Sequence, residues 1–296
     1  MTEQDTDRQS VRASTEIVLV IGAGTMGRGI AQAVAEAGHP TLLFDADQRN
    51  LEHGLAVLET AWERAVQKGK LASSDARAAR TRLQPAQGLD EAAAAAIVIE
   101  AIFEDPEIKV TLFRELDAIV PESALLASNT SSISITRLAA AVKAPGSFLG
   151  LHFFNPVPVL PLVEVVRGLR TDEATVNRAL GFVRGLGKTP VVVNDSPGFV
   201  VNRVLLPMIN EAVLCLAEGV AGKEAIDEVM KLGASHPLGP LALADLIGLD
   251  VCLDIMRTLH RDLGDDKYRP APLLARMVDA GKLGRKGGEG FYRYDR

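Results

Sequence analysis

Residues 17–27 read Ile17-Val18-Leu19-Val20-Ile21-Gly22-Ala23-Gly24-Thr25-Met26-Gly27 and decide the fold of the chain. The apolar run over 17–21 is rich in β-branched side chains, which is typical of a strand buried on both faces. A helical pattern follows over 26–37 and ends before Gly38, and a second strand is expected over 41–44. The segment therefore predicts a strand–turn–helix–strand unit near the start of the chain.

The glycines of this unit have the spacing of a dinucleotide-binding turn. Gly22 permits the tight turn, Gly24 lets the backbone approach a pyrophosphate, and Gly27 lets helix and strand pack closely. Asp45 follows the second strand, where a carboxylate accepts hydrogen bonds from ribose hydroxyls and repels a 2′-phosphate. We therefore predict that NAD, rather than NADP, binds at Asp45 and at a turn comprising Gly22, Gly24, Thr25, Met26 and Gly27.

The rest of the chain falls into two parts with different patterns. Helices are expected over 47–69, 74–83, 106–119, 135–142 and 172–186, and strands over 97–102, 124–127, 148–153, 162–166 and 189–193. This alternation predicts an α/β fold with a doubly wound, mostly parallel Rossmann-type sheet. From Pro197 onward only helical periodicity remains, over 197–218, 223–232, 240–263 and 271–280. We expect a disordered tail over 1–14, an NAD-binding domain over 15–194 and an all-α C-terminal domain over 195–296.

The composition argues against several classes of partner. A net charge of −6 provides no broad basic surface for nucleic acid or for an anionic membrane. No apolar stretch approaches the roughly 20 residues that span a bilayer, and we do not expect the polar N-terminus to be a secretory signal. Cys215 and Cys252 lack metal-ligand spacing, so we expect no metal site. They read as buried thiols of a reducing compartment, which predicts the cytoplasm.

Two polar residues in apolar strands are candidates for acid–base chemistry. His152 lies at the end of the strand over 148–153, although a satisfied core histidine is an alternative. Glu164 interrupts the apolar strand over 162–166, and a buried carboxylate needs a partner; the alternative is an edge-strand glutamate that faces water. A carboxylate bonded to one imidazole nitrogen raises the basicity of the other. His152 and Glu164 together therefore predict a general base.

Two further polar features have both a structural and a functional interpretation. Ser128-Asn129-Thr130-Ser131-Ser132 directly follows a strand. One of these residues is expected to cap the next helix, and another hydroxyl to face the cleft. Asn202 lies on an apolar helix face, where a helix–helix hydrogen bond would account for it.

Several segments together resemble one known family. They are Gly22 to Ala31, Ser128 to Ser132, His152-Phe153-Phe154-Asn155-Pro156-Val157-Pro158 followed by Leu162-Val163-Glu164, Pro197-Gly198-Phe199-Val200-Val201-Asn202-Arg203, Gly239-Pro240 with Asp245 and Gly248-Leu249-Asp250, and Gly288-Glu289-Gly290-Phe291-Tyr292. From Ile17 to its C-terminus, the chain resembles the NAD-dependent L-3-hydroxyacyl-CoA dehydrogenases of fatty-acid metabolism. Among these it is most similar to the short bacterial 3-hydroxybutyryl-CoA dehydrogenases.

The resemblance implies the roles of individual residues. It makes His152 the base and Glu164 its orienting partner, with Ser131 and Asn202 at the reacting oxygen or the thioester. Beyond the glycine turn and Asp45, it implies NAD contacts at Glu104, Lys109, Asn129 and Lys286. It implies a homodimer through the C-terminal domain. The helices expected over 47–69 and 74–83 are predicted to form a hairpin. Its basic residues are candidates for the CoA phosphates, with a solvated helix face as the alternative: Arg64, Lys68 and Lys70.

The implied activity is oxidation of an (S)-3-hydroxyacyl-CoA to the 3-ketoacyl-CoA, or the reverse, with short acyl chains such as 3-hydroxybutyryl. Two alternatives remain open from the sequence. One is a dehydrogenase of a CoA-free sugar acid on the same fold. The other is a non-catalytic NAD-binding structural or sensor protein, against which the complete set of Ser131, His152, Glu164 and Asn202 argues.

Overall fold

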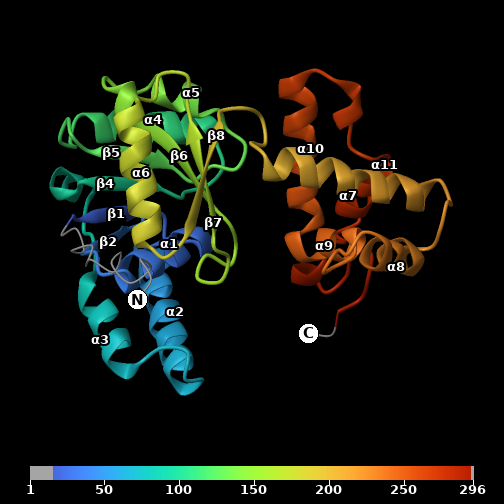
Figure 1. Cartoon of the computed structure of the whole chain (residues 1–296), viewed down its shortest axis with the longest axis horizontal. Helices are drawn as coiled ribbons and strands as arrows, with labels where there is room; N and C mark the ends of the chain where they lie inside the picture. Colours follow the sequence, from blue (N-terminus) through green and yellow to red (C-terminus); the bar gives the residue numbers. More distant parts are fainter. Residues whose placement is uncertain (1–15, 295–296) are drawn as a thin grey trace, which may run out of the picture. The chain divides into compact units, whose positions relative to one another are not determined.

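The computed structural model describes residues 16–294, so the tail expected over 1–14 lies outside the described residues. The chain divides into two compact units (Figure 1). The first unit ends at Asp195 and the second begins at Ser196. Each unit has its own apolar core.

Within the described residues, the first unit contains one eight-stranded sheet. Its strands lie in the order β3-β2-β1-β4-β5-β6-β7-β8. Every neighbouring pair is parallel except β6 and β7. The prediction of a mostly parallel, doubly wound sheet is confirmed. The strands are β1 (Val18–Ile21), β2 (Thr41–Phe44), β3 (Leu83–Pro85), β4 (Ile97–Glu100), β5 (Leu125–Ser128), β6 (Phe148–Phe153), β7 (Leu162–Arg167) and β8 (Thr189–Asn194).

The helices of this unit begin where the sequence supplies caps. Asp47 accepts a hydrogen bond from Arg49 N at the start of α2, and Asp105 caps α4, whose first residue is Pro106. Figure 1 shows α2 and α3 extending past the end of the sheet, as expected for a helical hairpin. The helices are α1 (Thr25–Glu36), α2 (Gln48–Gln67), α3 (Ser73–Arg82), α4 (Pro106–Asp117), α5 (Ile135–Ala139) and α6 (Glu173–Gly185), with 3₁₀ turns at Leu89–Ala94 and Pro145–Ser147.

The two faces of the sheet are covered by different helices, because alternate strand residues point to opposite faces. On one face, strand residues such as Leu151 and Val163 join a core cluster that includes residues of α1 and α6. On the other face, Phe148 meets Phe113 of α4 with ring centroids 4.7 Å apart. A side chain at Gly150 would collide with Ile135 of α5. His152 alternates with Leu151, so it points to the face of α4 and α5.

The second unit is helical, as predicted. Its core includes Leu206, Leu241, Leu253 and Leu274, each about 1% exposed or less. Among the described residues, no helix combines the length and the apolar character needed to cross a bilayer. The helices are α7 (Val201–Ala217), α8 (Lys223–Gly233), α9 (Pro240–Ile247), α10 (Leu249–Leu263) and α11 (Pro272–Asp279), with 3₁₀ turns at Asp266–Tyr268 and Arg285–Gly287.

The structure differs from the sequence-based expectation at several places, among them the helix expected from Pro197, which begins at Val201. The single helix expected over 240–263 is broken at Gly248, whose φ of +106° is incompatible with a continuous helix. The helix expected over 135–142 ends at Ala139. The short strand β3, which pairs with β2 at the edge of the sheet, was not predicted. It has only three residues, one of them Pro85, so it carries no periodic signal.

Candidate active site

The glycine turn lies where the strand order of the sheet reverses. From β1 the chain moves to β2 on one side, whereas β4 pairs with β1 on the other. Ligands of open α/β sheets bind at such a switch point, at the carboxyl ends of the strands. Gly22 has a φ of +104°, and a Cβ there would lie 2.5 Å from the carbonyl oxygen of Ala101. A Cβ on Gly27 would lie 1.7 Å from the carbonyl oxygen of Gly22, so both positions require glycine.

Gly24 behaves differently from the other two glycines. A Cβ at Gly24 would meet nothing within 4 Å, so the space above the N-terminus of α1 is open. Gly24 is the N-cap of α1 and supplies no side-chain hydrogen bond to the first turn, which contains Thr25 and Met26. The amides at this end therefore suit an anionic pyrophosphate.

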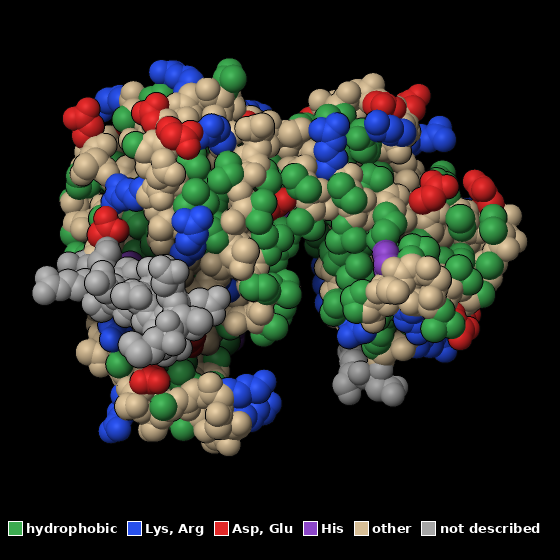
Figure 2. Space-filling view, in the orientation of Figure 1, with side chains coloured by type: hydrophobic (Ala, Val, Ile, Leu, Met, Phe, Trp, Pro, Cys, Tyr) green, Lys and Arg blue, Asp and Glu red, His purple; other side chains and the backbone are tan. Residues whose placement is uncertain are grey.

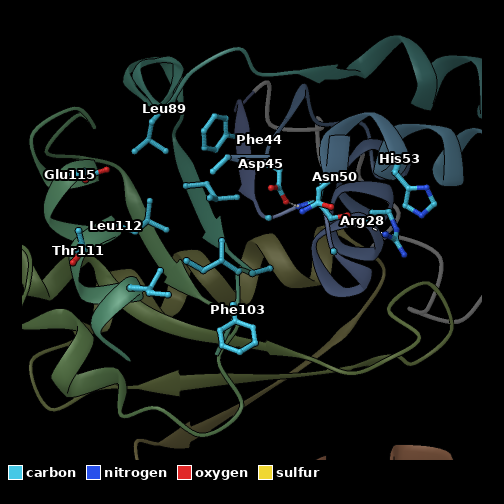
Figure 3. A pocket seen from close by; sticks show the side chains of 18 of the residues that line it. Arg28, Phe44, Asp45, Asn50, His53, Leu89, Phe103, Thr111, Leu112 and Glu115 are labelled. Carbon is cyan, nitrogen blue, oxygen red and sulfur yellow. Dashed lines mark hydrogen bonds between the residues drawn. The ribbon is translucent and has the colours of Figure 1, made fainter. Parts of the chain in front are cut away.

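A cleft of about 930 Å³ surrounds this turn. Figure 3 shows Asp45 and Asn50 on one side of it and Leu112 of α4 on the other. Asp45 is fixed by its own neighbours, because its Oδ2 accepts Ala23 N at 2.8 Å and its Oδ1 accepts Asp47 N at 3.0 Å. A dinucleotide such as NAD fits this cleft, which offers the open N-terminus of α1, the fixed carboxylate of Asp45 and an apolar side that includes Leu112.

His152 and Glu164 contact each other directly. They are register partners in the antiparallel pair of β6 and β7. Nδ1 of His152 lies 2.7 Å from Oε2 of Glu164, and the two side chains are 7% and 2% exposed. β7 lies between β6 and β8, so the alternative of a water-facing glutamate on an edge strand is wrong. Because β6 is parallel to β5, His152 lies at the carboxyl edge of the sheet, as the cofactor turn does.

The turn over 128–132 is held by Glu104. Oε1 of Glu104 accepts hydrogen bonds from Ser131 N at 3.1 Å and from Ser132 Oγ at 3.2 Å, and Thr130 Oγ1 donates to the same atom. Ser134 caps α5 by accepting from Arg137 N, so the expectation that a residue of 128–132 caps this helix is wrong. Ser131 itself is half-buried.

The remaining predicted residues have varied surroundings. The side chain of Asn129 accepts Phe153 N at 2.9 Å, next to His152. Lys109 is 1% exposed and is enclosed by carboxylates. Arg64, Lys68 and Lys70 are exposed on and just beyond α2. Their contacts with NAD or CoA stay predictions.

Two predicted residues belong to the second unit. Asn202 lies in the first turn of α7 and is 8% exposed. Lys286 donates to Asp250 Oδ2 at 2.6 Å within the same unit. Their roles also stay predictions.

Sequence profiles of a known family match nearly the whole described chain. The profile of the 3-hydroxyacyl-CoA dehydrogenase NAD-binding domain matches residues 17–196, and that of the C-terminal domain of the same enzymes matches residues 198–294. The chain belongs to the 3-hydroxyacyl-CoA dehydrogenase family. It is accordingly an NAD-dependent oxidoreductase with a Rossmann-type domain, as the resemblance implied.

Individual relatives agree with this assignment. The chain is 53% identical to a probable 3-hydroxybutyryl-CoA dehydrogenase of Bacillus subtilis, over 94% of this chain and 97% of that protein. It is 51% identical to a 3-hydroxybutyryl-CoA dehydrogenase of Bradyrhizobium diazoefficiens, over 93% and 94% of the two chains. Among solved structures, (S)-3-hydroxybutyryl-CoA dehydrogenase PaaH1 from Ralstonia eutropha superimposes with a TM-score of 0.92 at 48% identity, covering 96% of this chain and all of that one.

Sequence reasoning missed one buried residue of the site. Glu100, the last residue of β4, is 0% exposed and bonds both Lys109 and Ser128. Its position after Ile97-Val98-Ile99 is the same kind of signal as Glu164, a carboxylate in an apolar strand.

Proposed function

We propose that this family member interconverts short-chain (S)-3-hydroxyacyl-CoA and 3-ketoacyl-CoA thioesters, with 3-hydroxybutyryl-CoA and acetoacetyl-CoA as the preferred pair. The observation that carries the proposal is the buried contact of 2.7 Å between His152 and Glu164 at the carboxyl edge of the sheet. The names of the relatives support the short acyl chain.

His152 and Glu164, called the dyad below, supply the proton chemistry. Glu164 holds Nδ1 of His152, so Nε2 is the nitrogen that would take the proton of the substrate hydroxyl. The imidazolium that forms is stabilised by the carboxylate beside it. NAD, when bound, would supply the acceptor for the hydride that leaves C3 of the substrate. Ser131 and Asn202 would donate hydrogen bonds to the oxygen as its charge changes.

The substrate class is tested by turnover in the reducing direction. Consumption of NADH is measured with acetoacetyl-CoA, with longer 3-ketoacyl-CoA thioesters and with free 3-keto acids. We expect acetoacetyl-CoA to have the highest kcat/KM. A higher kcat/KM for a free keto acid would favour a CoA-free substrate, and tight NADH binding without turnover would favour a non-catalytic role.

We also propose that the exposed Arg64, Lys68 and Lys70 attract the CoA phosphates.

Asp45 is expected to set the preference for NADH. Asp45→Asn keeps one oxygen for the amide of Ala23 but removes the negative charge that would face a 2′-phosphate. The ratio of kcat/KM for NADH to that for NADPH should fall about tenfold or more, equivalent to about 1.4 kcal/mol. An unchanged ratio would show that other groups select the cofactor. Asp47→Asn, which changes the neighbouring helix cap, is the matched control.

We propose that the second unit mediates a homodimer. Several large apolar side chains on its helices are more than half exposed, as the apolar side chains on its visible surface in Figure 2 illustrate: Val204, Val229, Leu232 and Leu246. Sedimentation equilibrium should give about twice the chain mass of 31.5 kDa. Val204→Glu with Leu246→Glu should shift the mass toward one chain, and an unchanged mass would contradict the placement of these side chains in the dimer contact.

The two unpaired cysteines agree with a reducing compartment, for which we propose the cytoplasm.

A further inference from the structure

A second group of buried charges lies in the first unit, and the mechanism above does not use it. Glu100 ends β4 and is fully buried, and Lys109 of α4 is 1% exposed. The Lys109 ammonium bonds Oε1 of Glu100 and lies 3.1 Å from Oε2 of Glu104. It also lies 3.4 Å from the carbonyl oxygen of Ile102. The three N–H groups of the ammonium therefore have three oxygen partners, one from β4 and two from the loop that follows it.

Glu100 connects this loop to the turn that follows β5. Its Oε1 also accepts Ile102 N at 2.8 Å, and its Oε2 accepts Ser128 Oγ at 2.6 Å. Ser128 Oγ in turn accepts Thr130 N at 3.2 Å. Oε1 thus restrains the loop that follows β4, and Oε2, through Ser128, restrains the turn that leads to Ser131.

Glu104 restrains the other end of the same turn. It accepts from Thr130 Oγ1 and Ser131 N, while Thr130 Oγ1 accepts Ser132 N at 3.2 Å and Ile133 N at 2.9 Å. Burial raises the pKa of Glu104, but the Lys109 ammonium and the hydrogen bonds from Thr130 and Ser131 outweigh it, so the pKa lies below its ordinary value. Glu104 is therefore ionised at neutral pH and accepts hydrogen bonds with both oxygens.

The register of the sheet places this group beside the dyad. Glu100 pairs with Ser128, Ser128 pairs with Gly150, and His152 lies two residues further on the same face. Since neighbouring strands are about 4.8 Å apart, β4 and β6 are separated by about 10 Å. The turn after β5 leaves the sheet between them. Restraints on that turn therefore act on a segment that leaves the sheet beside β6, the strand that carries His152.

We infer that the Glu100–Lys109 pair is a positioning device for Ser131: Lys109 fixes Glu104, and Glu104 with Glu100 fixes the turn that presents the Ser131 hydroxyl. The inference rests on the proposed role of Ser131 in the reaction. A buried ion pair is a weak source of stability compared with apolar residues of similar volume. A hydrogen-bond donor to a reacting oxygen, in contrast, must be held within about 0.5 Å of its place.

A double-mutant cycle tests the inference. The charge-free variant carries Glu100→Gln and Lys109→Met. It removes both charges of the pair, so neither residue remains as an unpaired buried charge. We expect kcat for acetoacetyl-CoA reduction to fall about 30-fold or more, while the KM for acetoacetyl-CoA changes less than about threefold. Ser131→Ala alone should lower kcat by about 10²-fold, but by less than about threefold in the charge-free background. Additive losses, or an unchanged kcat in the charge-free variant, would overturn the inference.

The matched control is Asp117→Asn, at the other end of α4. Asp117 also pairs with a lysine, Lys143, and accepts its backbone amide at 2.8 Å, but it is remote from the turn in sequence and contacts. In this background Ser131→Ala should retain its full effect on kcat. A lost effect in the control would show that any disturbance of α4 produces the result, and this too would overturn the inference.

A measurement without turnover separates this inference from the proposed function. Amide hydrogen exchange of residues 130–133 should be about tenfold faster or more in the charge-free variant and unchanged in Asp117→Asn. If that variant does not fold, Glu104→Ala is used, since it leaves the buried pair and removes the side chain that holds Ser131 N. Unchanged exchange in the folded variant contradicts the inference even if wild-type turnover supports the function. Absence of wild-type turnover with faster exchange contradicts the function alone.

Discussion

His152→Ala is expected to lower kcat for acetoacetyl-CoA reduction by roughly 10²–10⁴-fold, the usual contribution of a general acid–base residue. The loss follows from the geometry, because the imidazole is the group whose Nδ1 is held at 2.7 Å by a buried carboxylate at the carboxyl edge of the sheet. The cofactor turn is built from other strands, β1 and β2, so the dissociation constant for NADH should change less than about threefold. Stopped-flow turnover and quenching of NADH fluorescence measure the two quantities.

A second histidine–carboxylate pair provides the matched control. His260 of α10 lies 3.1 Å from Asp266, but these side chains are 37% and 93% exposed. His260→Ala should leave kcat unchanged. If His152→Ala is too unstable to assay, His152→Gln keeps a donor toward Glu164 without a base and should show the same loss. Wild-type turnover by either folded variant would remove His152 from the proton transfer.

Local patterns predicted the Rossmann-type sheet because each signal, a glycine spacing or a continuous apolar run, can be read within a few residues of sequence. Gly22 and Gly27 are required by close approach of backbone, which leaves no room for a Cβ. The buried strand Val18–Ile21 is continuous and apolar, as strands covered on both faces are. Features that lack such a signal were missed. A three-residue strand such as Leu83–Pro85 has no periodicity, and the break at Gly248 interrupts a pattern that stays apolar on both sides.

The candidate site could be predicted where a carboxylate in an apolar strand indicated that its side chain is buried. Glu164 in an apolar strand required a partner, and the register of β6 and β7 supplies His152. Glu100 carried the same signal, but its partner Lys109 comes from α4, where a lysine gives no indication of burial. The cap of α5 was expected among residues 128–132, but the helix begins at Ile135 and the preceding Ser134 caps it. Glu104, from another loop, instead binds the hydroxyls of Thr130 and Ser132. Such long-range partners cannot be read from local sequence.

Glu164→Gln is expected to lower kcat by roughly 10²-fold or more even though its shape is preserved. The amide oxygen can still accept a hydrogen bond from Nδ1 of His152, so the ring keeps its place. What is lost is the negative charge beside the imidazolium, in a site where the two side chains are 7% and 2% exposed and water screens little. The variant therefore separates the charge of the carboxylate from its role in orientation. Steady-state kinetics with acetoacetyl-CoA and NADH provides the measurement.

The dyad is expected to act as a unit, which gives the experiment a second, independent readout. Because Glu164 acts through His152, adding Glu164→Gln to His152→Ala should cause little further loss of kcat. Asp266→Asn, the corresponding change in the exposed pair with His260, should not alter kcat in either background. Independent, multiplying losses from His152 and Glu164 would mean that the carboxylate contacts the reaction by another route. A wild-type kcat for Glu164→Gln would mean that position and packing of the imidazole suffice, and that the buried charge serves the fold alone.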